Sequence, residues 1–231
     1  MSNSDKKWLK RYRKSNKRSG LRAVIISVAA LFAIGLCVFL FFFRFSGKEQ
    51  RKVPPEELPP IDLTVKLLDP NPYSRPGTSL EQVKGIVVHY TANPGTDAMA
   101  NRNYFNNLPA INQKKAKDTY ASSHFVIDLD GEIVQCIPTN EIAYASNERN
   151  KDTISIECCH KRKNGKFTSQ TYQSLVELTT YLCLKFGLTE SDLIRHYDIT
   201  GKNCPKYYVE HPDAWEQFLA RIKQELEIRN P

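Results

Sequence analysis

Residues 23–43 form a stretch of 21 residues that contains no charged side chain. A helix needs about 20 apolar residues to cross the hydrocarbon core of a bilayer. The stretch also lacks the polar stripe that a helix on the surface of a soluble domain shows. We therefore predict one N-terminal transmembrane helix over residues 23–43, and a chain that folds on one side of a membrane.

A cleaved signal peptide is the alternative to this anchor. Its apolar region usually has about 7–15 residues and is followed by a cleavage site of small residues. Here the apolar stretch is longer and runs into Phe41-Phe42-Phe43-Arg44-Phe45, without an Ala-x-Ala site. The uncleaved anchor is the better interpretation, and a secreted protein follows if the segment is cleaved.

The nine basic side chains within residues 1–22 set the orientation, because positively charged flanks stay in the cytoplasm. Residues 1–22 are thus predicted to be a basic cytoplasmic segment. The rest of the chain is expected on the outer, cell-wall side of the cell membrane, as part of a single-pass protein.

The net charge of +8 could suggest a nucleic-acid partner, but its distribution argues against one. Residues 1–60 hold 13 Lys and Arg against 4 Asp and Glu, whereas residues 61–231 hold 20 against 21. A nucleic-acid-binding domain carries its positive charge on the folded part. We therefore expect no nucleic-acid partner.

Residues 44–60 contain Pro54-Pro55 and Pro59-Pro60 and are predicted to be a Pro-rich linker. Residues 61–231 are long enough for one domain, which we expect to be monomeric. This domain contains five cysteines, an odd number, so at least one thiol has a role other than an internal disulfide. Cys158 and Cys159 are adjacent in a predicted strand and should point to opposite faces.

The pattern of the outer domain alternates strands and helices. Strands are predicted at residues 84–90, 122–128, 132–137 and 153–158, with Asp130-Gly131 closing a hairpin. Amphipathic helices are predicted at residues 97–107, at 172–186 before Gly187, and from Pro212 onward. This order predicts a single α/β domain with a mixed β-sheet flanked by helices.

Three side chains could bind one zinc ion: His89 at a strand end, His196, and Cys204 eight residues later. Two nitrogens and a thiolate suit zinc, and three protein ligands leave the fourth position that a catalytic site needs. From the spacing alone, a histidine at a strand end such as His89 is more often a hydrogen-bonded structural residue, and His196 could belong to a capped turn.

Four motifs follow one another in this domain: Val87-Val88-His89-Tyr90-Thr91, then Ser123-His124-Phe125-Val126-Ile127, then Ile154-Ser155-Ile156-Glu157, and finally Arg195-His196-Tyr197-Asp198-Ile199 with Lys202-Asn203-Cys204-Pro205. In this order the chain resembles the zinc-dependent N-acetylmuramoyl-L-alanine amidases of the amidase-2 and peptidoglycan-recognition-protein superfamily. The resemblance covers about residues 75–220 and implies a peptidoglycan-recognition-protein-like fold.

The resemblance implies that His89, His196 and Cys204 are the ligands of Zn²⁺. It also implies that Glu157 is the catalytic acid–base residue, and that Lys202 stabilises the negative charge on the reacting carbonyl oxygen. One branch of the family has a catalytic Tyr where this chain has Ser123. A tyrosine contribution is therefore not expected there, and His124 is expected to be a core or supporting residue and not a ligand.

Three functions compete. The first is a peptidoglycan hydrolase that cleaves the amide bond between the lactyl group of N-acetylmuramic acid and L-alanine of the stem peptide. The second is a non-catalytic peptidoglycan-binding receptor on the same fold. The third is a glycoside hydrolase with two carboxylates, Glu157 and Asp198, about 5–9.5 Å apart. Only the first uses the two histidines, Cys204, Glu157 and Lys202 together.

Overall fold

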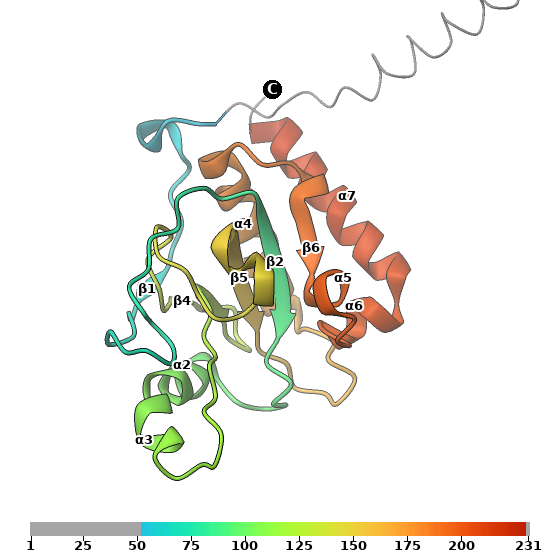
Figure 1. Ribbon diagram of the computed structural model, residues 1–231. Coiled ribbons are helices and arrows are strands. Elements are labelled where there is room, and N and C mark those ends of the chain that lie inside the picture. The colour runs from blue at the N-terminus through green and yellow to red at the C-terminus, as the bar shows by residue number, and fades with distance from the viewer. Residues whose placement is uncertain (1–51, 230–231) are drawn as a thin grey trace, which may run out of the picture. The chain divides into compact units, whose positions relative to one another are not determined.

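The structure is a computed structural model that describes residues 52–229 (Figure 1). The predicted segments 1–22 and 23–43, and the first part of the predicted linker, lie outside these residues. Within residues 52–229, no helix combines the length and the apolar character that crossing a bilayer requires. The prediction of a transmembrane anchor therefore stays a prediction.

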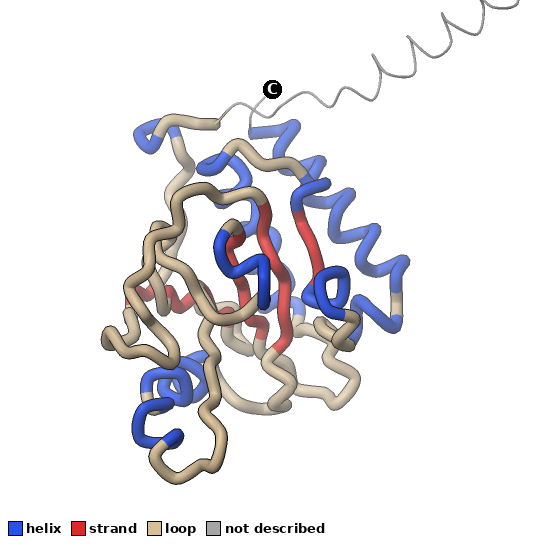
Figure 2. The backbone as a smooth tube through the Cα atoms, in the orientation of Figure 1, coloured by secondary structure: helices blue, strands red, loops and turns tan. Residues whose placement is uncertain are grey.

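A six-stranded mixed sheet lies at the centre of the domain, in the order β1-β4-β3-β5-β2-β6 (Figures 1 and 2). Strands β3, β5, β2 and β6 run parallel to one another, β4 pairs with β3 in antiparallel fashion, and β1 pairs with β4 in parallel fashion. The strands are β1 (Thr64–Val65), β2 (Gly85–Tyr90), β3 (Phe125–Ile127), β4 (Ile133–Gln135), β5 (Thr153–Cys158) and β6 (Leu193–Arg195).

Helices cover both faces of this sheet. The long helices α4 (Ser169–Phe186) and α7 (Pro212–Arg229) lie on one face, and the shorter α2 (Ala98–Asn106) packs against β3 and β4 from the other. The remaining helical elements are α3 (Leu108–Asn112), α5 (His196–Thr200), α6 (Lys206–Glu210) and the 3₁₀ turns η1 (Pro55–Glu57), η2 (Asn147–Lys151) and η3 (Glu190–Asp192).

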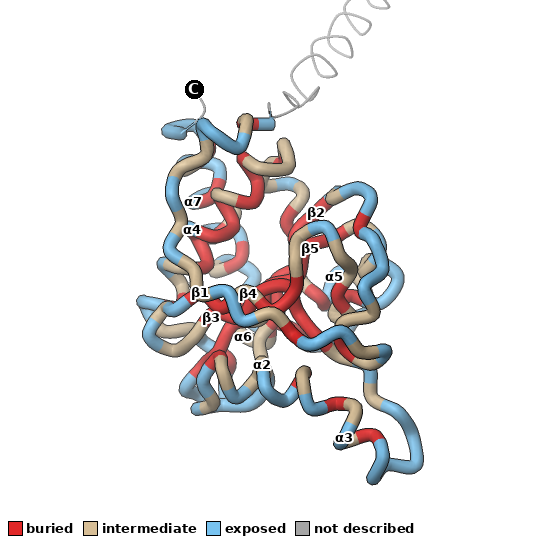
Figure 3. The backbone as a smooth tube through the Cα atoms, turned by 90° about the vertical axis from the view of Figure 1, so that its left-hand side faces the viewer, coloured by how far each residue is buried: buried red, intermediate tan, exposed pale blue. Residues whose placement is uncertain are grey.

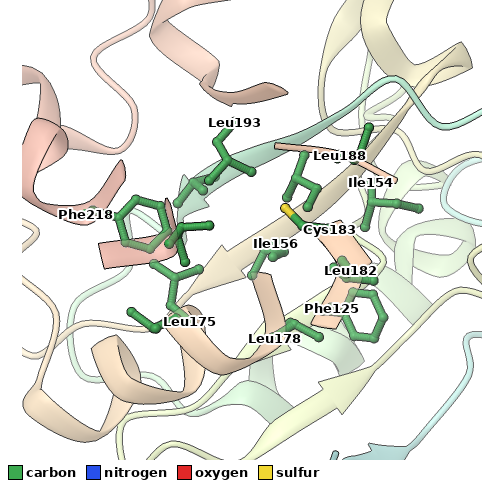
Figure 4. Close-up of a cluster of buried hydrophobic side chains, with 14 of the residues drawn as sticks. Phe125, Ile154, Ile156, Leu175, Leu178, Leu182, Cys183, Leu188, Leu193 and Phe218 are labelled. Atoms are coloured by element: carbon green, nitrogen blue, oxygen red, sulfur yellow. The ribbon is translucent and has the colours of Figure 1, made fainter. Parts of the chain in front are cut away.

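The main core fills the space between the sheet and helices α4 and α7. Ile154 and Ile156 of β5 point into it and face Leu178 and Leu182 of α4, and Phe218 of α7 lies at the other end of the same cluster, near Leu175 (Figure 4). Figure 3 shows this arrangement from the side, with buried strands next to α4 and α7. Since side chains alternate along a strand, the residues between these isoleucines face the other side of the sheet.

Most predicted elements are confirmed. Strand β5 has the predicted bounds, and residues 122–137 form the predicted hairpin around Gly131, which has a φ of 97°. Helix α4 ends at Gly187 in the left-handed conformation, as a glycine after a helical pattern predicts. Strand β1 and the short helices α3, α5 and α6 were not predicted, because two to five residues carry too little periodicity.

Cys158 and Cys159 point to opposite faces of the sheet, as predicted for adjacent residues of a strand. Cys158 lies in the core on the α4 side, whereas Cys159 lies in the second core on the α2 side. Among residues 52–229 all five cysteines are buried and unbonded to one another. The pairing that the sequence left open is therefore absent from the described domain.

Part of the predicted linker packs on this domain. Val53 is buried in the main core, its backbone N–H donates to the carbonyl of Leu184 over 2.9 Å, and Leu58 contacts the same core. The packed part of the domain thus includes residues on the N-terminal side of residue 61.

Candidate active site

His89 and Glu157 come from neighbouring parallel strands on the α2 side of the sheet. In β2, Ile86 and Val88 point into the main core, so His89 points to the opposite side. The register pairs His89 with Glu157 of β5. Residues that pair in register on parallel strands point to the same face of the sheet. His89 and Glu157 are therefore neighbours, although they are 68 positions apart in the sequence.

His196 and Cys204 reach the same place from the edge strand β6. The chain leaves β6 and turns at once into α5, whose first residue is His196. The Asp198 side chain accepts a hydrogen bond from the backbone N–H of Arg195 and caps this helix. Cys204 follows α5, and its carbonyl accepts from the N–H of Tyr197, which ties its loop back to the helix.

These three side chains form a compact donor set. One possible ligand atom from each of His89, His196 and Cys204 lies within 4.8 Å of the others, and all three residues are buried. The sulfur of Cys204 is 3.8 Å from Nδ1 of His89, and the two imidazole rings are 4.7 Å apart between centroids. The structure thus brings together the three ligands predicted from the sequence.

The state of these donors fits a metal ion. Burial, together with the positive charge of Lys202, lowers the pKa of His89 and of His196, which favours the neutral imidazole that metals bind. Nδ1 of His196 is buried and has no hydrogen-bond partner in the protein. Burial raises the pKa of Cys204 to about 12, and a thiol in this position needs a bound cation to become a thiolate.

Glu157 adds a carboxyl group next to this donor set. Burial raises its pKa to about 7, and the nearby charge of Lys202 acts in the opposite direction. Its Oε2 atom is buried without a hydrogen-bond partner. A carboxyl with a free oxygen and a pKa near neutrality can both accept and return a proton at physiological pH.

Lys202 lies on the exposed loop between α5 and Cys204. It lines the same cleft as His89, His196 and Glu157, which has a volume of about 380 Å³. Four of the five residues predicted as functional therefore line one cleft, and the sulfur of the fifth, the buried Cys204, lies 3.8 Å from Nδ1 of His89.

Other residues of the cleft were not identified from the sequence. Tyr120, Tyr144, Asn147 and Asn150 line it, and Ser146 lies directly behind His89. They come from loops whose polar residues show no periodic pattern, so no signal in one sequence separates them from ordinary loop residues.

Two residues near the cleft have structural roles. Ser123 is fully buried, and its hydroxyl donates to the carbonyls of Phe125 and Ser155, so it does not face the cleft. His124 is also buried, and its Nδ1 accepts from the backbone N–H of Ser155. This confirms the expectation that His124 is a core residue.

An α/β domain that brings two histidines and a cysteine together beside a cleft with a carboxyl group defines a candidate metal-dependent hydrolase. The family model described as N-acetylmuramoyl-L-alanine amidase matches residues 79–207. The chain belongs to this family.

Curated relatives agree with this membership. The N-acetylmuramoyl-L-alanine amidase CwlL of Bacillus licheniformis is 37% identical over 164 residues, which cover 66% of this chain and 44% of CwlL. The N-acetylmuramoyl-L-alanine amidase BlyA of Bacillus subtilis (strain 168) is 36% identical over 177 residues, covering 68% of this chain and 45% of BlyA. The chain thus spans less than half the length of these relatives.

Solved structures show the same fold. The catalytic domain of XlyA superposes with a TM-score of 0.57 and 27% sequence identity, covering 69% of this chain and 99% of that domain. A mutant endolysin from Bacillus subtilis gives the same TM-score with 28% identity. The predicted α/β fold with its mixed sheet is therefore confirmed.

Proposed function

We propose that the chain is an N-acetylmuramoyl-L-alanine amidase, a peptidoglycan hydrolase that cuts the amide bond between the lactyl group of N-acetylmuramic acid and L-alanine of the stem peptide. The observation that carries the proposal is the convergence of His89, His196 and Cys204 on one possible metal site, next to a cleft that both histidines and Glu157 line. The names of the curated relatives support the same reaction. One copy of the domain supplies every residue that the proposal needs, which supports a monomer.

We assign Zn²⁺ as the resident metal, with His89, His196 and Cys204 as its ligands. Bound zinc polarises the amide carbonyl and lowers the pKa of a water molecule to about 7. Two neutral imidazoles and one thiolate are a ligand set that zinc prefers, and three protein ligands leave room for the substrate and the water.

Glu157 and Lys202 supply the remaining chemistry. The free oxygen of Glu157 takes the proton from the attacking water and returns it to the leaving amine of L-alanine. Lys202 places its positive charge on the cleft side, where it offsets the negative charge that develops on the carbonyl oxygen. Because the charge of Lys202 also lowers the pKa of Glu157, the two residues are electrostatically coupled.

The reaction can be tested with purified muropeptides and the full chain in detergent. We expect free stem peptides with a new L-alanyl amino group, and intact disaccharides, identified by mass. Binding of muropeptides without cleavage would instead support the receptor. New reducing sugar ends would support a glycoside hydrolase.

We also propose that residues 23–43 anchor the enzyme in the cell membrane, with residues 1–22 in the cytoplasm and the domain on the cell-wall side. The support is the length of the uncharged stretch and the nine basic residues before it. The substrate is found on the same side of the membrane, so topology and proposed reaction agree.

This topology predicts the result of protease treatment. Protease added to intact cells without their wall should digest the domain and leave a membrane-protected fragment that contains residues 1–43. A mature protein in the medium, with a new N-terminus near residue 46, would contradict the anchor and support a cleaved signal peptide.

A further inference from the structure

The two histidines of the candidate metal centre present the same ring atom to it. Nδ1 of His89 faces the sulfur of Cys204 at 3.8 Å. Nδ1 of His196 is buried and makes no hydrogen bond. In both rings, therefore, the Nδ1 lone pair is the one that is left for a metal ion.

The other nitrogen of each ring contacts two consecutive residues. Nε2 of His89 lies 3.3 Å from the hydroxyl oxygen of Ser146, and Nε2 of His196 lies 3.2 Å from the side-chain oxygen of Asn147. An amide oxygen only accepts hydrogen bonds, so Nε2 of His196 carries the proton. The same assignment for His89 makes Ser146 the acceptor and leaves Nδ1 unprotonated.

We propose that Ser146 and Asn147 are positioning residues that hold both histidines in the Nε2–H tautomer, with their Nδ1 lone pairs directed at one metal ion. This inference rests on the proposed function, since it assumes that the His-His-Cys set binds zinc. A neutral imidazole can bind a metal only through the nitrogen that lacks a proton, so the partner of the other nitrogen decides which atom is available. Hydrogen-bond partners of this kind also fix the ring orientation.

The backbone turn at Ser146 and Asn147 places the two hydrogen-bond acceptors next to each other. Asn147 has a φ of 52°, a left-handed conformation that asparagine tolerates better than most residues. The side-chain oxygen of Asn150 accepts from the backbone N–H groups of Ala145 and Ser146. The carbonyl of Ser146 accepts from the N–H of Arg149 at the start of η2. This turn directs two adjacent side chains at two different rings.

Ser146 and Asn147 differ in how far they are exposed to water, so they are expected to contribute to metal binding in different ways. Ser146 is almost completely buried, so water cannot replace its hydroxyl group beside His89. Asn147 is exposed and lines the cleft, so its loss leaves His196 open to water on that side. We expect each side chain to contribute to metal affinity. Asn147 should also limit the rotation of the His196 ring on the side that faces solvent.

The first test replaces Asn147 with glycine and with aspartate in the full chain. Glycine keeps the left-handed backbone but removes the acceptor, so we expect zinc affinity, measured by competition with a chelator, to fall by about 10–100-fold. Asn147→Asp keeps an acceptor oxygen and should restore the affinity. Ala92→Gly is the matched control, because Ala92 also has a left-handed backbone, with a φ of 54°, and contributes no acceptor.

The second test removes the hydroxyl group behind His89. Ser146→Ala should also weaken zinc binding by about 10–100-fold. Ser74→Ala is its control, because Ser74 is equally buried and its hydroxyl accepts a hydrogen bond from Asn71, outside the residues that line the cleft. Unfolding temperatures of the metal-free variants show whether any of them has lost its fold.

The tautomer can also be measured by spectroscopy, independently of enzyme activity and in the absence of metal. In the metal-free wild type, nitrogen NMR should find His196 in the Nε2–H form, with a proton that exchanges slowly, and Asn147→Gly should make this exchange fast. The Nδ1–H form in the wild type, or zinc affinities of the Ser146 and Asn147 variants equal to those of their controls, would overturn the inference. If the wild type itself bound no zinc, the proposed function would fail first.

Discussion

Replacing Glu157 with glutamine is expected to lower kcat by about 10²–10⁴-fold, the range that general acid–base catalysis typically contributes. Glutamine has nearly the same shape and keeps its hydrogen-bonding capacity, but it cannot take a proton from the attacking water. Oε2 of Glu157 has no partner in the protein, so the substitution breaks no hydrogen bond there. The fold and the bound zinc should remain.

KM should change much less than kcat, because proton transfer belongs to the transition state and not to substrate binding. Glu177→Gln is the matched control: it removes the same charge from the exposed side of α4, on the other face of the sheet. The measurement is muropeptide hydrolysis together with zinc content. Full activity of Glu157→Gln would remove this residue from the mechanism, and lost zinc would make it a ligand or a supporting residue.

The sequence predicts the parts of this site that lie on regular elements. The continuous apolar run before His89 predicts a strand buried on both faces, and the alternation around Glu157 places this residue opposite Ile154 and Ile156. Both predictions are confirmed by β2 and β5. That these strands are neighbours with His89 in register with Glu157 depends on pairing over long distances, which periodicity does not contain.

The polar face of β5 illustrates a second limit. Its alternation also fits a strand with one face in water, yet Ser155 is buried and its backbone N–H donates to His124. Of the polar residues on this face, Ser155 belongs to a buried hydrogen-bond network and Glu157 lines the cleft. Burial of a polar face depends on the loops that cover it, and these loops have no pattern that a single sequence shows.

The roles that we infer for Ser146 and Asn147 lie furthest from what a sequence predicts. Both belong to a turn defined by one left-handed residue and by side-chain-to-backbone hydrogen bonds from Asn150. Their neighbours in space, His89 and His196, are 57 and 49 positions away. The resemblance of the four motifs identifies candidate ligands, but it contains no information on the residues behind them.

The largest effect on the metal is expected from Cys204→Ser. Apparent binding free energies of structural zinc sites with four ligands are about 10–16 kcal/mol, or roughly 2.5–4 kcal/mol for each ligand if the four share it equally. Serine replaces a thiolate with a neutral hydroxyl group, so zinc affinity should fall by roughly 10²–10³-fold, and hydrolysis should fall with zinc occupancy. The measurements are zinc stoichiometry after dialysis and chelator competition.

Cys183→Ala provides the control for this experiment, because Cys183 is an equally buried thiol in a different environment. Its side chain lies in the main core between α4 and the sheet (Figure 4), on the face of the sheet opposite to His89. Burial raises the pKa of its thiol, and no charged group nearby favours the thiolate, since Asp192 and Glu190 raise the pKa further. Its loss should lower the unfolding temperature and leave the zinc content unchanged. Equal zinc loss in the two variants would contradict the assignment of Cys204 as a ligand, because disturbance of the fold would then explain both results.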